Sequence, residues 1–437
     1  MTHQPPTVVV IGAGLAGLTA ATTAATNGAR VTVLDARTHI GGRARTTAAS
    51  GFLFNQGAHA LYRGGTAWEI LTGFGITPRG RSPEATHADG LRADGSLAPL
   101  PGNARTMIRT RLVRPIAKFE LARLLARPAR LTSTVEPGTS LQEWIEARSR
   151  HADVRKVLAL FARVSTYCGE LDTLDADAGV AQMVQALTHG VVYLDAGWQQ
   201  LVDGLQQVAL SRGVAIHTQA KADAIEVRAD GMTVRTPGGD VDADAVVFAA
   251  GGPRDAHTLV QDGGASLARW AAEEQPVVAS ALDLAFGALP VPTRRITFGL
   301  DEPMYFSVHT PYARLAPGGG EVAHLLWYGD RGVDPRRRFE WLLDRAQPGW
   351  RDHVVDERYG HRLVVAHGRP RPGHGLAGRP PVAVPDLPGV FVAGDWVGPD
   401  GLLADAVFAS GRAAGHAAAK AAGRRQSAPT PRESASP

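Results

Sequence analysis

The sequence has a single cysteine and no long apolar run. Cys168 is the one cysteine among 437 residues, which excludes an internal disulfide and is typical of a reducing compartment. No stretch reaches the roughly 18 uninterrupted apolar residues that a bilayer-spanning helix needs. Residues 1–7 carry no basic region ahead of the first apolar strand, so we expect no secretory leader and predict a cytoplasmic protein.

A strong overall charge is also missing. The formal net charge is +4, too small to indicate a nucleic-acid partner. Arginine supplies most of the positive charge, because lysine occurs only at positions 118, 156, 221 and 420. No metal is expected, and the sequence carries no signal for oligomerisation.

Segment 105–130 is a local exception in charge. Ile108, Leu112, Ile116 and Phe119 recur at three- and four-residue spacing, which predicts an amphipathic helix interrupted at Pro115. The segment has one acid, Glu120, and its basic residues are Arg105, Arg109, Arg111, Arg114, Lys118, Arg123, Arg127 and Arg130. Two interpretations stay open: a peripheral membrane contact, or a solvated helix face packed on the rest of the protein.

The N-terminal region contains a strand, a glycine turn, a helix and a second strand that ends in an acid. The segments are Val8–Ile11, Gly12-Ala13-Gly14-Leu15-Ala16-Gly17, Val31–Leu34 and Asp35. Gly12 permits the tight turn, Gly14 lets the backbone approach a pyrophosphate, and Gly17 lets the helix pack closely on the sheet. The helix N-terminus favours phosphate, and Asp35 is placed to accept hydrogen bonds from a ribose. The pattern predicts dinucleotide binding.

Two further motifs indicate which dinucleotide is bound. Ala36-Arg37-Thr38-His39-Ile40-Gly41-Gly42-Arg43 follows Asp35, and Val390-Phe391-Val392-Ala393-Gly394-Asp395-Trp396 lies near the C-terminal end. With the glycine turn, they resemble, in the same order, the motifs of the FAD-dependent amine oxidase and phytoene desaturase superfamily. The resemblance implies that Gly41, Gly42 and Arg43 run under the pyrophosphate and that Gly394 and Asp395 hold the ribityl chain.

The resemblance also implicates segments between these motifs. In relatives, the backbone near 220–222 meets the adenine, and the final helix, which starts near Leu403, aims its N-terminus at the flavin. Cys168 lies far along the chain from the C-terminal segment where monoamine oxidases bond a cysteine to FAD, so we expect noncovalent FAD, with a histidine linkage left open. The expected FAD-binding residues are Gly12, Ala13, Gly14, Leu15, Ala16, Gly17, Asp35, Ala36, Arg37, Gly41, Gly42, Arg43, Gly57, Ala58, His59, Lys221, Ala222, Ala250, Gly251, Gly394, Asp395, Leu403 and Ala404.

The fold class expected is α/β, with a Rossmann-like FAD-binding domain interleaved with a mixed α+β substrate domain. FAD-binding segments are expected at 1–77, 196–276 and 386–424, a mostly helical substrate segment at 78–195, a substrate sheet at 277–385 and a disordered tail at 425–437. A loop rich in Gly, Pro and Arg is expected over 78–103. Strands of the substrate sheet are expected at 277–284, 304–309 and 322–328.

One candidate catalytic residue lies in Asn55-Gln56-Gly57-Ala58-His59-Ala60-Leu61-Tyr62. This segment resembles the glycine-x-histidine segment of plant-type phytoene desaturases and bacterial squalene-associated desaturases, which carry an acid where Asn55 stands. The implied chemistry is hydride transfer to flavin N5 in a dry pocket, which does not itself require a catalytic base. His59 either protonates or orients a group at the flavin edge, or is a structural histidine bonded to backbone.

Two features favour a desaturase over an amine oxidase. No lysine occurs between Lys221 and Lys420, whereas many amine oxidases place one beside N5, and Gly394-Asp395-Trp396 is closer to the motif of plant-type desaturases. The leading prediction is therefore an FAD-dependent oxidoreductase that dehydrogenates or desaturates an apolar, isoprenoid-like small molecule. The alternatives are an amine or amino-acid oxidase using oxygen, a flavin-dependent isomerase, and a prenyl-binding non-enzyme similar to Rab GDP-dissociation inhibitors. The nearly complete FAD motif argues against the last.

Overall fold

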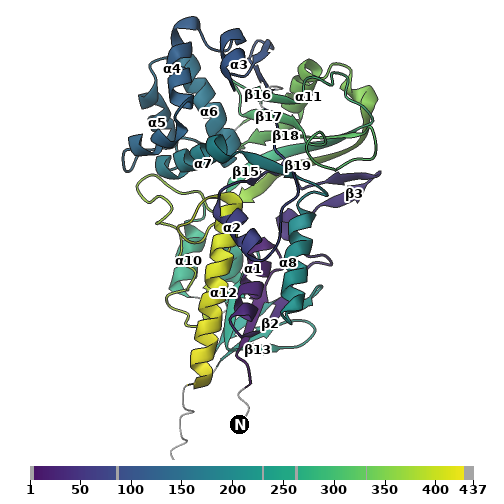
Figure 1. Cartoon of the computed structure of the whole chain (residues 1–437). Coiled ribbons are helices and arrows are strands. Elements are labelled where there is room, and N and C mark those ends of the chain that lie inside the picture. Colours follow the sequence, from purple (N-terminus) through teal and green to yellow (C-terminus); the bar gives the residue numbers. More distant parts are fainter. Residues whose placement is uncertain (1–3, 85–87, 229–230, 261–263, 331, 428–437) are drawn as a thin grey trace, which may run out of the picture.

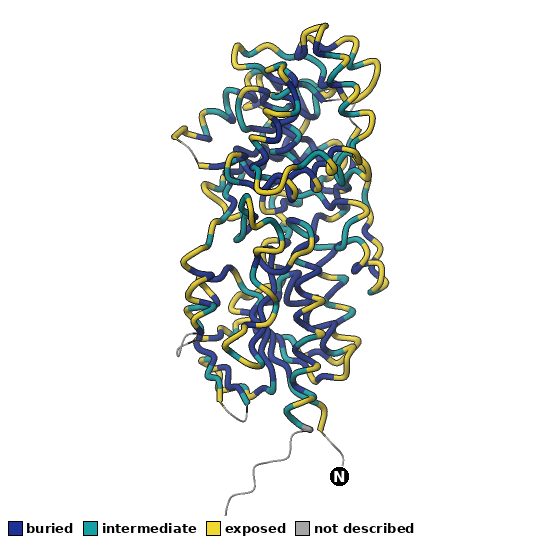
Figure 2. The backbone as a smooth tube through the Cα atoms, turned by 90° about the vertical axis from the view of Figure 1, so that its left-hand side faces the viewer, coloured by how far each residue is buried: buried dark blue, intermediate teal, exposed yellow. Residues whose placement is uncertain are grey.

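The fold divides into two halves stacked along one long axis (Figure 1). The computed structural model describes residues 4–84, 88–228, 231–260, 264–330 and 332–427. Both ends of the described chain lie at the tip of the lower half. Buried segments run through the middle of each half, and exposed segments lie at the periphery (Figure 2).

The lower half is built on a parallel sheet. Its strands, in spatial order, are β10 (Ala215–His217), β2 (Arg30–Leu34), β1 (Thr7–Ile11), β14 (Ala245–Phe248) and β20 (Val390–Val392). These strands are rich in buried valine, as expected for a parallel sheet covered on both faces. A three-stranded antiparallel sheet packs into the same core and consists of β11 (Ala224–Val227), β12 (Met232–Arg235) and β13 (Val241–Ala243).

Helices complete this core. They are α1 (Leu15–Thr26), α2 (Thr66–Gly73), α8 (Gln199–Ser211), α9 (Pro253–Leu259), α10 (Ala265–Ala272) and α12 (Leu403–Ser427). Figure 1 shows α1 between α8 and α12. Glycines allow α12 to lie close against α1, because a Cβ on Gly411 would stand 2.6 Å from the Ala16 carbonyl oxygen and one on Gly415 2.3 Å from that of Ala20. The last helix of the chain is thereby seated on the first.

The upper half is built on a seven-stranded mixed sheet. In spatial order its strands are β19 (Val354–Ala366), β15 (Val277–Phe286), β18 (Glu321–Tyr328), β17 (Met304–Val308), β16 (Ile296–Gly299), β7 (Ala88–Leu91) and β8 (Leu97–Pro99). Its outer face packs on α11 (Pro335–Ala346) and the short helix η5 (Trp350–His353) through Leu284, Phe306 and Leu325.

The inner face of this sheet packs against a helical block. The block consists of α3 (Ala104–Arg109), α4 (Pro115–Leu125), η3 (Pro128–Arg130), η4 (Thr132–Thr134), α5 (Leu141–Arg148), α6 (Ala152–Thr166) and α7 (Ala176–His189). Short elements connect the two halves: η1 (Gly42–Ala44), the pair β3 (Thr47–Ala49) and β4 (Phe52–Phe54), and the trio β5 (Leu61–Tyr62), β9 (Val191–Leu194) and β6 (Gly80–Arg81).

The strands expected at 277–284, 304–309 and 322–328 are β15, β17 and β18, and Pro115 does begin a new helix. Two expectations were wrong. Segment 78–103 is not a continuous loop, because β7 pairs with β16 and places Ala88 and Leu91 in the core. Residues 425–427 belong to α12, while the rest of the expected tail lies outside the described residues. Over the described part of the chain, no helix is long and apolar enough to cross a membrane.

Candidate functional site

The glycine turn leaves open space at the start of α1. Gly12 adopts φ +102°, and a Cβ there would stand 2.8 Å from the Ala249 carbonyl oxygen. A Cβ on Gly17 would stand 1.8 Å from the Gly12 oxygen, whereas a Cβ on Gly14 would meet nothing within 4 Å. Gly14 caps α1 without a side-chain hydrogen bond, and the first turn, which begins Leu15-Ala16, contains no acid. This combination of space and positive helix end fits a dinucleotide pyrophosphate.

The Gly-Gly segment lies beside this turn. The Gly41 N–H donates to the Ala13 carbonyl at 2.8 Å. Gly42 adopts φ +54°, and a Cβ on it would lie 3.6 Å from the Gly14 Cα. The Gln56 side chain donates to the Gly42 carbonyl at 3.1 Å. Residues expected to run under a pyrophosphate therefore do border the open space at Gly14.

Asp35 is buried at the end of β2, with both oxygens engaged. One oxygen accepts from the Ala13 N–H at 2.7 Å and the other from the Arg37 N–H at 2.8 Å. Each carboxylate oxygen has a further lone pair with which to accept a ribose hydroxyl. Ala36 is exposed on the intervening turn.

The segment expected near the adenine runs alongside Asp35. The Ala220 N–H donates to the Asp35 carbonyl at 2.8 Å. Ala222 is buried in the lower core, whereas Lys221 is exposed and its ammonium lies 3.0 Å from Asp223. The structure thus places the backbone of this segment beside β2 and directs the Lys221 side chain to solvent.

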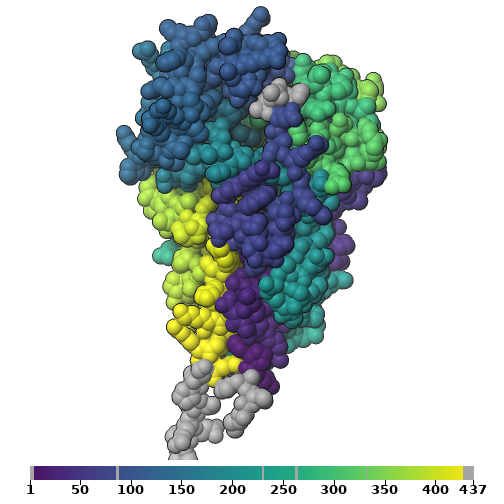
Figure 3. Space-filling model, viewed as in Figure 1, coloured from purple at the N-terminus to yellow at the C-terminus, as the bar shows by residue number. Residues whose placement is uncertain are grey.

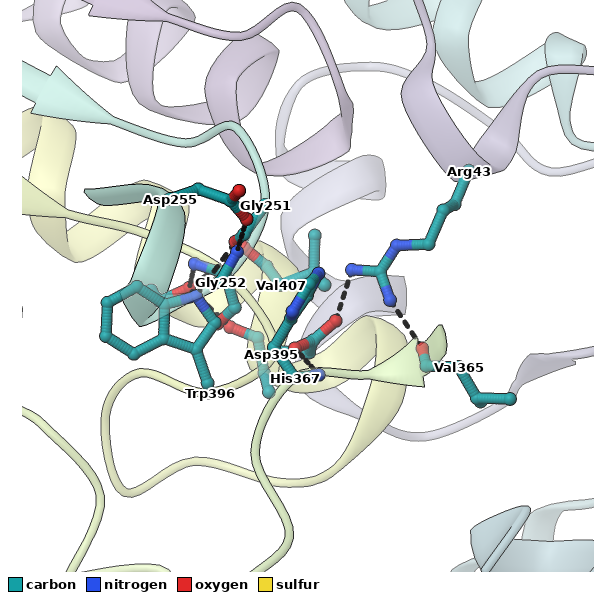
Figure 4. Close-up of polar contacts among 12 residues, drawn as sticks. Arg43, Gly251, Gly252, Asp255, Val365, His367, Asp395, Trp396 and Val407 are labelled. Carbon is teal, nitrogen blue, oxygen red and sulfur yellow. Dashed lines mark hydrogen bonds and ion pairs between the residues drawn. The ribbon is translucent and has the colours of Figure 1, made fainter. Parts of the chain in front are cut away.

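The loop after β14 contributes Ala250 and Gly251. The Ala250 Cβ stands 2.9 Å from the position a Cβ on Gly12 would take. The Gly251 carbonyl accepts from the Trp396 indole N–H at 3.1 Å, as Figure 4 shows. Trp396 is fully buried and lies edge-on to Trp270, with ring centroids 6.3 Å apart. Its observed role is packing and loop attachment.

Arg43 and Asp395 form an ion pair (Figure 4). The second Arg43 nitrogen donates to the Val365 carbonyl at 2.5 Å, and the other Asp395 oxygen accepts from the His367 N–H at 2.7 Å. The Gly394 N–H donates to the Ser410 hydroxyl at 3.0 Å, which ties this loop to α12. The pair brings together two segments far apart in the sequence, one expected under the pyrophosphate and the other at the ribityl chain.

Arg379 supports the same loop and was not found from the sequence, which carries no signal for it. Its guanidinium is buried and donates to the carbonyls of Asp395 at 3.0 Å and Gly401 at 2.9 Å. Burial lowers the pKa of Arg379 to about 10. The arginine fixes the chain between Asp395 and the start of α12.

The start of α12 closes the site. Leu403 adopts φ +53°, and Ala404 is half-buried. The Asp405 carboxylate accepts from the Ala67 N–H at 2.7 Å and from the Gln185 amide at 2.9 Å. Burial raises the pKa of Asp405. Asp405 thereby attaches the start of α12 to the first turn of α2.

Cys168 lies far from the C-terminal segment in sequence but not in space. It shares a small cavity with Asp395, Leu402 and Leu403. Burial raises the pKa of the Cys168 thiol to about 11, so the thiol stays protonated near neutral pH. Because the thiol is protonated, we still expect FAD to be bound noncovalently.

His59 is half-buried where the two halves meet. Its Nδ1 donates to the Gly57 carbonyl at 3.0 Å, and its ring lies edge-on to Trp198, with centroids 5.0 Å apart. The Gly57 N–H donates to Asp283 on β15 at 3.1 Å. Burial lowers the pKa of His59. Ala58 packs in the core of the upper half, so the segment Gly57–His59 lies directly on the upper sheet.

This arrangement defines the class of two-domain dinucleotide-binding flavoproteins: a glycine turn, a Gly-Gly segment and a C-terminal aspartate converge below a second sheet. A profile described as "flavin containing amine oxidoreductase" matches residues 15–418. The chain belongs to this family of flavin-containing oxidoreductases.

Individual relatives are more distant. The chain is 27% identical over 284 residues to a hydroxyneurosporene desaturase from Rubrivivax gelatinosus, covering 56% of this chain and 53% of the desaturase. It is 32% identical over 107 residues to a coproporphyrinogen III oxidase from Propionibacterium freudenreichii subsp. freudenreichii, covering 24% of this chain and 20% of that oxidase. The matches thus span about half of the first relative and a fifth of the second.

Among solved structures, an oxidoreductase from Methanosarcina mazei is similar in fold. It superposes with a TM-score of 0.76 at 20% identity, covering 93% of this chain and 99% of the other. At this identity the likeness shows a shared fold.

Proposed function

We propose that this enzyme dehydrogenates an apolar, isoprenoid-like small molecule between the inner face of the upper sheet and the FAD-binding half. The observation that carries the proposal is the character of that inner face. The inward positions of its central strands include Ala279 and Ala281 on β15, Leu326 and Tyr328 on β18 and Tyr305 on β17, all buried. These residues also pack on the helical block, so we place the substrate at the edge of this apolar core, where it would be bound by burial rather than by charge.

Charged groups are almost missing from these positions. Asp283 is the one acid among the inward positions of β15, β17 and β18, and it is paired with His324. Buried tyrosines extend the same surface toward the helical block, where Tyr62 donates to the Ser165 carbonyl at 2.9 Å. An amine substrate would need an unpaired carboxylate or an open aromatic cage, so the alkyl chain of an isoprenoid fits better.

The proposed cofactor residues are those the sequence predicted. Gly12–Gly17, Gly41, Gly42 and Arg43 border the space for the pyrophosphate, Asp35 and the backbone at 220–222 flank the adenosine, and Gly394 and Asp395 hold the ribityl chain. Ala250, Gly251, Leu403 and Ala404 border the same region. When bound, FAD supplies the acceptor for the hydride that leaves a substrate carbon.

His59 is the residue proposed to complete the reaction. Dehydrogenation removes a hydride from one carbon and a proton from its neighbour, and the electron pair of the second C–H bond becomes the double bond. Nε2 of His59 takes that proton. His59 is suited to this role because burial lowers its pKa, so the ring is neutral and able to accept.

The relatives support the substrate class without deciding it. A hydroxyneurosporene desaturase is, by its name, a desaturase of a hydroxylated isoprenoid, while a coproporphyrinogen oxidase dehydrogenates a tetrapyrrole. A coproporphyrinogen carries carboxylates, and the inward positions of β15, β17 and β18 offer no unpaired cation to bind them. The first relative therefore guides the proposal.

The outer surface of the helical block supports a lipid-dissolved substrate. Ile108, Ile116 and Phe119 are 77%, 72% and 80% exposed, and all lie on α3 and α4. Exposed arginines surround them, including Arg105, Arg109 and Arg123. We propose that this surface, at the end of the molecule away from both described chain ends (Figures 1 and 3), rests on anionic lipid.

The test is anaerobic flavin reduction. FAD-loaded protein is mixed under argon with an acyclic hydroxylated carotenoid or squalene in detergent, with coproporphyrinogen III, or with putrescine, and the oxidised-flavin absorbance near 450 nm is followed. Free FAD in the same detergent is the control. Bleaching by the carotenoid or squalene is the expected result. Bleaching by the tetrapyrrole or the amine alone overturns the substrate class, and conversion of the isoprenoid without bleaching indicates an isomerase.

A further inference from the structure

The backbone of Gly57 is contacted by titratable side chains at both its N–H and its carbonyl. Its N–H donates to the Asp283 Oδ2 at 3.1 Å, and its carbonyl accepts from His59 Nδ1 at 3.0 Å. On the far side, Nδ1 of His324 donates to the Asp283 Oδ1 at 2.7 Å. The contacts form one series of hydrogen bonds that runs from His324 through Asp283 and the backbone of Gly57 to His59.

The chemistry of the acceptors assigns the protons in this series. A carbonyl and a carboxylate only accept, so Nδ1 carries the hydrogen in both histidines. In a neutral imidazole the other nitrogen then holds the lone pair. Nε2 of His59 is therefore the basic nitrogen as long as Gly57 keeps its orientation, and Gly57 keeps it through Asp283.

Burial of the pair Asp283–His324 costs free energy of folding. The two residues stand directly opposite each other on β15 and β18, with side chains 6% and 0% exposed. An apolar pair of similar size at such a site is often as stable or more stable, because no carboxylate then has to leave water. Asp283 accepts from a backbone amide two residues before His59, and this contact points to a positioning role.

We propose that Asp283 and His324 are positioning residues that restrain the backbone of Gly57 through its N–H and thereby hold the carbonyl that sets the tautomer of His59, with Nε2 as the base. This inference rests on the proposed role of His59 and deepens it. Gly57 suits the arrangement because φ is +87° and a Cβ there would already stand 3.5 Å from Ala281 Cβ, so the loop lies directly on the sheet.

Charges around His59 act in both directions. Burial lowers the pKa of His59, as do His324 and Arg43, while the hydrogen bond to the Gly57 carbonyl and the Asp283 carboxylate raise it. Loss of the carboxylate charge therefore lowers the pKa further. Trp198 is the remaining ring packed against His59 and carries no charge.

The test is nitrogen NMR of the imidazoles in FAD-loaded and FAD-free protein labelled with ¹⁵N-histidine, with His59→Gln used to assign the signals. In the parent protein at pH 8, His59 is expected as the Nδ1–H tautomer. Asp283→Ala should give a mixture of tautomers, and Asp283→Asn should keep the tautomer, because its amide oxygen still accepts from Gly57, but should titrate at lower pH. Glu120→Gln, which alters the His151–Glu120 contact in the helical block, is the control and should leave His59 unchanged.

A parent-like tautomer and titration of His59 in Asp283→Ala overturns the proposal. Should Asp283→Ala fail to fold, an unchanged titration in Asp283→Asn overturns it instead. The readout needs no substrate, so failure of the isoprenoid assay does not affect it. With a substrate in hand, Asp283→Ala should slow flavin reduction roughly tenfold while KM stays the same.

Discussion

Arg43 and Asp395 are joined by an ion pair across 352 residues of sequence. Asp395 is 3% exposed, whereas the Arg43 side chain is 43% exposed. The buried aspartate thus anchors the arginine, whose side chain remains partly accessible. The pair connects the N-terminal and C-terminal parts of the proposed cofactor site.

Asp395→Asn should purify with much less FAD than the parent. The asparagine oxygen can still accept from the His367 N–H, but the Arg43 charge loses its partner and the arginine is no longer held at the site. Because Arg43 is partly hydrated, the cost to the stability of the FAD-free protein should be only about 1 kcal/mol. The FAD-to-protein absorbance ratio and thermal melts measure both effects. Glu226→Gln, which breaks an ion pair remote from the site, is the control, and full FAD occupancy in Asp395→Asn would contradict the assignment.

Gly14→Ala should impair FAD binding, whereas Gly17→Ala should impair folding. A methyl group on Gly14 enters open space, so the FAD-free protein should lose less than about 1 kcal/mol yet bind little FAD. A methyl group on Gly17 collides with the Gly12 carbonyl and should cost more than about 2 kcal/mol in folding. Urea unfolding and FAD titration of the refolded proteins separate the two. Normal FAD affinity in Gly14→Ala would show that the pyrophosphate does not bind at this turn.

Asp405→Asn should stabilise the FAD-free protein increasingly as pH rises. Burial raises the folded-state pKa of Asp405, so its carboxyl contributes most below the unfolded pKa near 4, and this contribution is lost as pH rises through the folded pKa. Asparagine accepts from the Ala67 N–H through its oxygen, and its NH2 can donate to the Gln185 amide oxygen once that amide is turned over, without that loss. In thermal melts between pH 4 and 8, the melting temperature of the variant should rise relative to that of the parent as pH increases.

Asp386→Asn provides a comparison of opposite sign. The hydrogen bond from Ser266 lowers the pKa of Asp386, so removal of this charge should cost stability above pH 4 rather than below it. A difference between Asp405→Asn and the parent that is flat with pH, or that runs in the same direction as in Asp386→Asn, would contradict the burial argument.

Ile116→Ser with Phe119→Ser should weaken binding to vesicles of phosphatidylserine and phosphatidylcholine by at least about tenfold, since each side chain would bury apolar area in the lipid. Both side chains are exposed, so thermal melts should not change. High salt should weaken the parent as well. Leu210→Ser, at a 51% exposed leucine of α8 in the other half, is the control. If the double variant binds vesicles normally but changes mass in light scattering, the surface is instead a contact between copies of the chain.

Local patterns predicted the nucleotide-binding elements well. β1, α1, β2 and the acid at its end follow from valine runs and glycine spacing within 30 residues, and α12 begins at Leu403 as expected. Each of these signals is carried by neighbouring residues, so no knowledge of tertiary contacts is needed to find them.

Features that depend on strand pairing were not predictable. β7 lies in a segment of turn-forming composition and is a strand because β16 supplies its hydrogen-bond partners. Asp283 and His324 are 41 residues apart, and only the register of β15 on β18 brings them together. Arg379 is similar, because its acceptors are backbone carbonyls that any sequence could provide.

The packing of α12 across α1 bears on how the protein is made. Strand β20 and helix α12 are the last described elements to leave the ribosome, yet β20 pairs with β14 and α12 covers Ala16 and Ala20 of α1. A nascent chain therefore keeps an apolar side of α1 uncovered until α12 has been synthesised. The core of the lower half can be completed only then, and the apolar surface exposed before that point favours aggregation.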